Sequence, residues 1–297
     1  MPKPTVELIS RGHQLLEAPL WHPQHGLLAT DAQVGGVWRF AEHADPELIV
    51  ANRKGIGGMA LHADGGLVIS GRNVACKRML GEAGADDTLV LLGNDPDRGV
   101  IGFNDLTTDQ DGRIYVGSLG FRAMDGGAAE GRTGFLHMID LDGSSRVVAQ
   151  NVELTNGLGW SPDGTRLYHS DSSRHVVKAY DRQPDGSLKP PAVFALTPFG
   201  HPDGLAVAQD GSVWVAMAFA SVACRFAPDG HEIERVEFPV PMVTSLCFGG
   251  PDLGDLYVVS GAKDAPPQLG GCVFRVHVEV PGLARPLARV RLPAPAA

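Results

Sequence analysis

The chain has 297 residues, a formal net charge of −9, 43% hydrophobic residues and many glycines and prolines. This acidic balance argues against nucleic acid as a partner, since such binding needs a concentrated basic face. No run approaches the roughly 20 apolar residues that a membrane span needs, and the first residues lack the apolar core of a signal peptide. We therefore expect a cytoplasmic protein with no membrane partner.

One local pattern recurs six times along the chain: a short apolar run, a turn rich in Asp and Gly or other small residues, and a second apolar run. Each copy predicts an antiparallel hairpin. The copies repeat about every 40 to 50 residues, as four-stranded propeller blades do. The predicted fold is therefore all-β, a six-bladed β-propeller with a central metal-binding channel. The six stretches are residues 17–30, 58–70, 104–117, 156–169, 203–216 and 244–259.

The remaining strands are expected between these hairpins, at residues 36–40, 134–140, 176–181, 221–226 and 271–276. Propellers usually close their ring with strands from both chain ends, so residues 5–10 should pair near 272–280 or 287–292. Residues 1–297 are expected to form one domain, with the last residues a flexible tail. Two stacked all-β domains are the alternative, disfavoured because the repeats cross the midpoint without a linker. The four cysteines form no Cys-x-x-Cys pair and are expected to be reduced.

Isolated polar residues mark the first strand of four repeats. The first strand of a blade lines the central channel, so equivalent positions converge at one end of it. Those positions hold Glu17, Asn104, Asn156 and Asp203, with Asp105 a weaker rival to Asn104. Any one of them alone is more often a turn residue. Together they predict an all-oxygen site for one divalent metal ion, calcium first, with magnesium, manganese or zinc as alternatives.

Several longer motifs resemble the gluconolactonase, senescence marker protein and luciferin-regenerating enzyme family. They occur in the family order and cover nearly the whole chain. The resemblance implies a six-bladed propeller with one divalent metal in its channel, and a hydrolase that acts on a carboxylic ester bond, a lactonase. Its substrate and partner would be a small-molecule lactone. The motifs are residues 17–21, 103–105, 111–118, 156–164 with 167–171, 202–207, and 243–252 with 256–259.

The resemblance also implies roles for the four polar residues. Glu17, Asn156 and Asp203 match the family's metal ligands, and Asn104 matches an Asn close to both metal and substrate. Asp203 is the implied catalytic base. The cation would polarise the lactone carbonyl and acidify a water whose proton Asp203 accepts, and the tetrahedral oxyanion would rest on the metal.

One departure from the family concerns the substrate. Sugar-lactone members commonly have an Arg two residues before the Asn, where this chain has Gly102. Without that donor, polyol hydroxyls are less well satisfied, so we expect a lactone less polar than the aldonolactones. Alternatively, a compensating donor such as Arg72 or Arg122 preserves sugar-acid lactonase activity.

Loops are expected to complete the substrate site. The Gly-rich segment 121–134 is read either as a lid that carries Phe121 and Arg122 or as a surface excursion. His201 could orient substrate or assist proton transfer, or could simply pack on Phe199. The substrate-binding set is Asn104, Gly102, Phe121, Arg122 and His201. A non-enzymatic propeller, either calcium-binding and regulatory or an interaction platform, is the alternative function.

Overall fold

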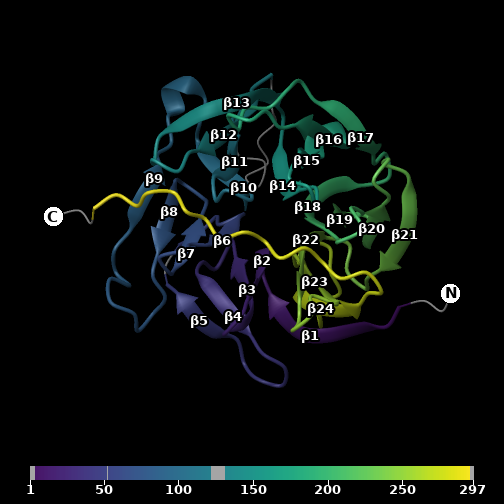
Figure 1. Cartoon of the computed structure of the whole chain (residues 1–297). Helices are drawn as coiled ribbons and strands as arrows, with labels where there is room; N and C mark the ends of the chain where they lie inside the picture. Colours follow the sequence, from purple (N-terminus) through teal and green to yellow (C-terminus); the bar gives the residue numbers. More distant parts are fainter. Residues whose placement is uncertain (1–3, 52, 122–130, 295–297) are drawn as a thin grey trace.

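Six four-stranded antiparallel sheets surround a central axis in the computed structural model, which describes residues 4–51, 53–121 and 131–294 (Figure 1). The sheets are the blades of the all-β, six-bladed propeller that the repeats predicted, and the fold prediction is confirmed. Two short 3₁₀ helices of the described ranges, η1 (Pro96–Arg98) and η3 (Ser172–Arg174), lie in loops. Among the described residues, no helix is long and apolar enough to cross a membrane.

In blades one to five the strands follow one another outward in chain order, and each of the six predicted hairpins forms the two innermost strands of a blade. The strands are β2 (Leu16–His22), β3 (Gly26–Asp31), β4 (Val37–Phe40) and β5 (Glu47–Val50) in blade 1; β6 (Met59–Leu61), β7 (Leu67–Ile69), β8 (Val74–Lys77) and β9 (Leu89–Leu92) in blade 2; β10 (Gly102–Thr108), β11 (Ile114–Leu119), β12 (Gly134–Ile139) and β13 (Ser145–Val152) in blade 3; β14 (Thr155–Trp160), β15 (Arg166–Asp171), β16 (Val176–Asp181) and β17 (Ala192–Leu196) in blade 4; β18 (His201–Val207), β19 (Val213–Ala218), β20 (Val222–Phe226) and β21 (Glu232–Glu237) in blade 5; and β22 (Val243–Gly249), β23 (Asp255–Ser260), β24 (Gly271–His277) and β1 (Val6–His13) in blade 6.

Blade 6 combines both ends of the chain. Its outermost strand is β1, which pairs antiparallel with β24 from Val6 opposite Val276 to His13 opposite Gly271. Of the two pairing partners considered for the N-terminal strand, the structure has the segment near 272–280. Pairing β1 with β24 joins the two ends of the chain in one blade and holds the ring closed.

Aromatic side chains fill the spaces between neighbouring blades. Trp21 of blade 1 stacks on Tyr257 of blade 6, with ring centroids 5.6 Å apart, and Tyr115 of blade 3 meets the ring of Trp160 in blade 4 edge-on at 4.9 Å. Trp214 is only 1% exposed. Stacked and edge-to-face pairs add to the hydrophobic free energy of burial, so these contacts fix how adjacent blades pack and hold the inner strands in place.

The chain after β24 crosses the axis instead of joining a blade. Residues 278–294, here called the C-terminal strap, run over the centre of the ring in Figure 1. The strap passes the ends of the inner strands: Leu283 N–H donates to the carbonyl of Val207 at 3.1 Å, and Ala288 N–H donates to that of Leu61 at 2.8 Å. The tail expected at the C-terminus falls mostly on residues 295–297, outside the described residues.

Candidate active site

The four polar residues predicted for the channel lie near the starts of four inner strands: Glu17 on β2, Asn104 on β10, Asn156 on β14 and Asp203 on β18. Each inner strand changes register against its neighbour at that point. The irregularities fall between residues 17 and 20, 103 and 106, 155 and 158, and 202 and 205. A bulge re-aims side chains, so the same local distortion recurs in four blades where a polar residue faces the axis. We call this end of the channel the site end.

A chain of hydrogen bonds joins blades 3, 4 and 5 at the site end. Asn104 Nδ2 donates to Asn156 Oδ1 and to the carbonyl of Thr155, and Asn156 Nδ2 donates to Ser172 Oγ at 2.7 Å. Ser172 Oγ in turn donates to the carbonyl of Pro202 at 2.6 Å. Because the Ser172 hydrogen goes to Pro202, its oxygen must accept from Asn156, which aims the Asn156 carbonyl oxygen toward Asn104.

The carboxamide oxygen of Asn104 lies beside a glycine. A Cβ atom at Gly57 would lie 1.9 Å from Asn104 Oδ1, so any larger residue would displace that oxygen. Gly57 precedes β6 in blade 2, and its N–H donates to Ser70 Oγ at 3.2 Å. Blade 2 lacks a polar residue in the repeated register, and its contribution here is the space that a glycine leaves.

Two carboxylates at the site end, those of Glu17 and Asp203, have raised pKa values. Burial raises the pKa of Glu17 well above its ordinary value, and the charges of Asp203 and Asp105 raise it further, against the N–H of Ala18. Burial and the charge of Asp105 likewise raise the pKa of Asp203, which is 7% exposed, against the N–H of Gly204. The ionised form is therefore costly at both groups, and a bound cation would stabilise it.

Asp105, the weaker rival in the sequence, belongs to the same electrostatic group. Burial raises its pKa to about 6, opposed first by the charge of Arg285 and then by hydrogen bonds from the N–H groups of Leu106 and Leu158. The Leu106 N–H lies 2.7 Å from Asp105 Oδ1. The site end therefore contains three carboxylates, of which one has an Arg as its counter-charge.

The chemistry of these residues fits a hard divalent cation. Two carboxylates and two carboxamides supply oxygen donors, which calcium and magnesium prefer, and the raised pKa values report negative charge with too little compensation. Among the residues that the structure describes, no group of three or more His, Cys, Asp or Glu is arranged to hold a metal ion. The four candidate ligand residues do not form a group of this kind, because two of them are Asn.

A row of rings and one cation flanks the site end beside Asp203. The ring of His201 lies 4.4 Å from that of His175 and 5.9 Å from that of Phe219, between centroids. Phe219 is 44% exposed and has φ of +63°, and the ammonium of Lys263 lies 5.1 Å from its ring centroid. His201 therefore packs on His175 and Phe219 rather than on Phe199, whose ring faces Arg235.

The other expected substrate residues are placed as follows. Gly102 begins β10, and a Cβ atom there would meet only the carbonyl oxygen of Gly71, at 3.2 Å. Gly71 and Phe103 exchange backbone hydrogen bonds, which puts the exposed Arg72 next to this strand end. Phe121 is buried, at 4% exposure. Arg122 and most of the proposed lid segment lie outside the described residues.

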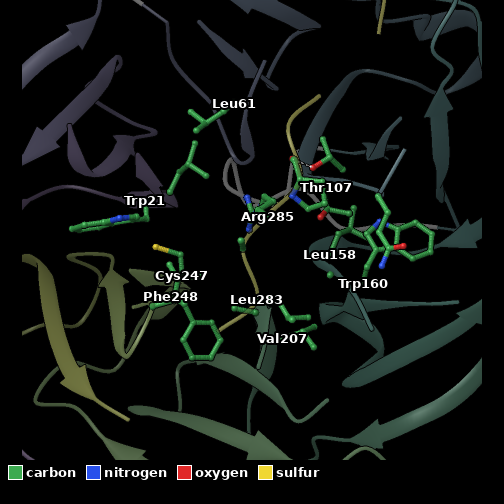
Figure 2. Close-up of a pocket in the computed structure, with 18 of the residues that line it drawn as sticks. Trp21, Leu61, Thr107, Leu158, Trp160, Val207, Cys247, Phe248, Leu283 and Arg285 are labelled. Carbon is green, nitrogen blue, oxygen red and sulfur yellow. Dashed lines mark hydrogen bonds between the residues drawn. The ribbon is translucent and has the colours of Figure 1, made fainter. Parts of the chain in front are cut away.

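A cavity of about 300 Å³ lies at the opposite end of the channel, under the C-terminal strap (Figure 2). Its walls are the last residues of inner strands and the strap itself, and they are mostly apolar. None of the four candidate ligand residues lines it, so it is separate from the candidate active site. The residues that shape it include Trp21, Leu158, Trp160, Val207, Phe248 and Leu283.

Sequence reasoning missed Ser172, Gly57 and the counter-charge Arg285. Ser172 directly follows β15, inside η3, and neither the repeat pattern nor a turn motif distinguishes it. Its role depends on a hydrogen bond to the next blade. For Gly57, the only signal in the sequence was its position directly before Gly58, the residue that opens the second hairpin.

The six blades form a closed ring, and carboxylates and carboxamides gather at one end of its axis. These features place the protein in the class of propellers with a polar site in the channel. Residues 15–262 match the model of the SMP-30/Gluconolactonase/LRE-like region. The chain belongs to this family, which confirms the resemblance inferred from its motifs.

Three similar proteins extend the comparison. A 6-deoxy-6-sulfogluconolactonase from Pseudomonas putida is 29% identical over 95% of this chain and 98% of its own length. Regucalcin from Xenopus laevis is 30% identical over 93% of this chain and 95% of its own. A solved structure of luciferin-regenerating enzyme superposes with a TM-score of 0.84 at 25% identity, covering 97% of this chain and 100% of the other. The expected class, a carboxylic ester hydrolase, agrees with the first of these names.

Proposed function

We propose that this protein is a divalent-metal-dependent lactonase, with calcium as its metal, that hydrolyses a small lactone less polar than an aldonolactone. The observation that carries the proposal is the hydrogen-bonded pair Asn104 and Asn156, at the same end of the channel as the carboxylates of Glu17 and Asp203, whose pKa values are both raised. Membership of the lactonase-containing family supports the reaction type. The oxygen-only donor set supports calcium.

In this proposal Glu17, Asn156 and Asp203 hold the cation, and Asn104 faces both cation and substrate. A divalent cation at this position supplies electrophilic activation of a carbonyl and of a water molecule. Asp203 accepts the proton of the attacking water, which forms a bond to the lactone carbonyl carbon. The ring C–O bond then breaks, and the alkoxide oxygen takes up the proton. Burial raises the pKa of Asp203, which makes its carboxylate a stronger base.

Two features bear on the substrate. Gly102 supplies no side-chain donor to hydroxyl groups where an Arg would, and Phe219 offers an exposed apolar ring near His201. Both favour a substituent that does not demand many hydrogen bonds. The specific observation that favours a sugar-acid lactone instead is the exposed Arg72, one residue beyond the Gly71 bonded to Phe103. The name of the Pseudomonas putida relative supports that second candidate.

The test is a lactone panel, from aldonolactones to alkyl-substituted rings, assayed by acid release with chelator-treated and calcium-restored protein. Turnover that disappears with the metal and returns on its addition is expected, and Asp203→Asn serves as the inactive control. Calcium binding without turnover of any lactone would instead support a non-enzymatic calcium-binding propeller.

A further inference from the structure

The cavity under the C-terminal strap, here called the strap pocket, has the size and the lining of a small-molecule binding site. Its volume of about 300 Å³ is at the lower end of the range for ligand pockets. Side chains from all six inner strands reach it, and most of them are apolar (Figure 2). They include Leu61, Leu158, Val207 and Phe248. Walls of this kind favour a ligand with an apolar body, because binding removes that body from water.

The strap forms one wall of the strap pocket and is anchored to the blades on both sides of Arg285. Leu283 N–H donates to the carbonyl of Val207 in blade 5 at 3.1 Å, and Thr108 Oγ1 in blade 3 donates to the carbonyl of Pro286. These bonds fix the backbone on either side of the arginine. The pocket is therefore preformed, and little ordering entropy opposes the binding of a ligand there.

One charged side chain lines the strap pocket, and its hydrogen-bond donors are only partly used. Nη1 of the half-buried Arg285 donates to the carbonyl of Met59 at 2.9 Å. Among the residues that the structure describes, the guanidinium makes no second hydrogen bond and no ion pair, and no Asp or Glu lines the pocket. The charge of Asp105 acts on Arg285 from outside the pocket walls. A guanidinium has five N–H donors in a planar fork that matches a carboxylate, so Arg285 keeps donors for an anionic group in the pocket.

A second donor without a partner belongs to the same pocket. Trp160, which is 8% exposed, lines it, and the Nε1 of this side chain is buried with no hydrogen-bond partner in the described ranges. Buried polar atoms of native proteins are nearly always paired, so an orphan N–H needs an explanation. An oxygen acceptor on a bound ligand would provide one. Two incompletely used donors in an otherwise apolar pocket indicate a ligand that is mostly apolar and carries a negatively charged acceptor group.

We propose that the strap pocket binds a small carboxylic acid with an apolar body, whose carboxylate accepts hydrogen bonds from the guanidinium of Arg285. The apolar walls disfavour a polyhydroxylated acid, because its hydroxyl groups would lose water without gaining new partners. The positive charge of Arg285 disfavours an amine. The proposal goes beyond the proposed function and does not rest on it, because the strap pocket contains none of the four candidate metal ligands.

Titration calorimetry with sodium octanoate at pH 8 tests the proposal, with 1-octanol as the uncharged compound of the same length. Octanoate should bind to the wild type with one molecule per chain. Its affinity should exceed that of 1-octanol by roughly tenfold or more, because hydrogen bonds between charged groups are stronger than those to a neutral hydroxyl. Equal affinity for the two compounds, or no binding of octanoate, would overturn the proposal.

Three variants locate the binding site. Arg285→Met removes the charge but keeps an unbranched apolar side chain, so octanoate should bind roughly tenfold or more weakly while 1-octanol binds as before. Arg291→Met removes an exposed Arg from the same strap and should change neither affinity. Ala206→Leu, which adds volume to the pocket wall on β18, should weaken the binding of both compounds. Wild-type octanoate affinity in Arg285→Met or in Ala206→Leu would contradict the proposal.

Calcium separates the strap pocket from the site end. Octanoate should bind equally well to chelator-treated protein, to calcium-restored protein and to Asp203→Asn, because the pocket is separate from the candidate metal ligands. Octanoate binding that requires calcium would place the carboxylate on the metal and overturn the proposal. Should Arg285→Met fail to fold, the preference of the wild type for octanoate over 1-octanol and its weakening in Ala206→Leu decide. Absence of lactone turnover with this binding pattern intact would contradict the proposed function alone.

Discussion

The carboxamide of Asn156 donates a hydrogen bond to Ser172 Oγ at 2.7 Å, and through this contact the site end is tied to blade 5. A metal-ligating side chain that is free to rotate loses conformational entropy when the metal binds, and this loss lowers metal affinity. A residue that already fixes the carboxamide therefore raises metal affinity without touching the metal. Ser172 occupies that position, between Asn156 and the carbonyl of Pro202.

Ser172→Ala should therefore weaken metal binding more than it weakens the fold. Loss of such an outer partner typically costs about 10- to 100-fold in metal affinity. Calcium titration calorimetry measures this, and Ser161→Ala, which removes a hydroxyl bonded to Asp163 in an exposed turn of the same blade, is the matched control. Equal calcium affinity in Ser172→Ala and wild type would show that Asn156 needs no such support.

Asp203→Asn should abolish most turnover while the propeller stays folded. The change removes the proposed base and one negative charge with little change in shape, and loss of a general base costs on the order of 10² to 10⁴ in rate. Steady-state kinetics and circular dichroism provide the two readouts. Asp163→Asn, at an exposed turn, should retain activity. A variant that binds metal and turns over at the wild-type rate would contradict the assignment of Asp203.

The sequence predicted the inner strands of the blades better than the outermost strands. The inner hairpins alternate apolar residues around a turn with Asp and Gly, and all six were predicted. Outer strands such as β13 and β21 are largely exposed, so they lack the buried face that creates a pattern. The four channel residues followed from their shared register. Ser172 and Arg285 did not, because their roles arise from contacts between blades and from a strap that crosses the axis.

The stability of the metal-free protein should depend on pH through Asp105. Its pKa is raised to about 6 in the native state, from an ordinary value of 3.8, so the native state holds this proton where the unfolded state has lost it. The contribution of Asp105 to the free energy of unfolding is therefore fully present below about pH 4, and it is lost as the pH rises through about 6. Burial lowers the pKa of His137 to about 4, so the contribution of His137 has the opposite sign: it destabilises the native state as the pH falls.

The measurement is therefore the difference in melting temperature between Asp105→Asn and wild type, both free of metal. At pH 7.5 the variant should melt higher, by roughly 5 °C, because it carries one buried charge fewer. At pH 4 the two should melt alike. Saturating calcium should remove most of the difference at pH 7.5, and a difference that does not vary with pH would rule out a raised pKa for Asp105.

Substrate choice should change with the residue at position 102. In the wild type we expect higher kcat/KM for an alkyl-substituted lactone than for an aldonolactone, since each hydroxyl that loses water without a new partner costs about 1 to 3 kcal/mol. Gly102→Arg restores a donor. The new Cβ would lie 3.2 Å from the carbonyl oxygen of Gly71, at the start of β10, so that carbonyl must shift by a few tenths of an ångström to accept it.

Gly102→Arg should shift the ratio of the two kcat/KM values toward the aldonolactone by roughly tenfold or more, the factor that one recovered hydrogen bond allows. Arg72→Met distinguishes the competing explanation. If Arg72 already supplies the donor, the wild type prefers the aldonolactone and Arg72→Met loses that preference, whereas Arg98→Met, at an exposed Arg with an 85% accessible side chain in another loop, keeps it. A strong aldonolactone preference in wild type would overturn the expectation of a less polar substrate, and its loss in Arg72→Met would identify Arg72 as the residue that replaces the missing Arg.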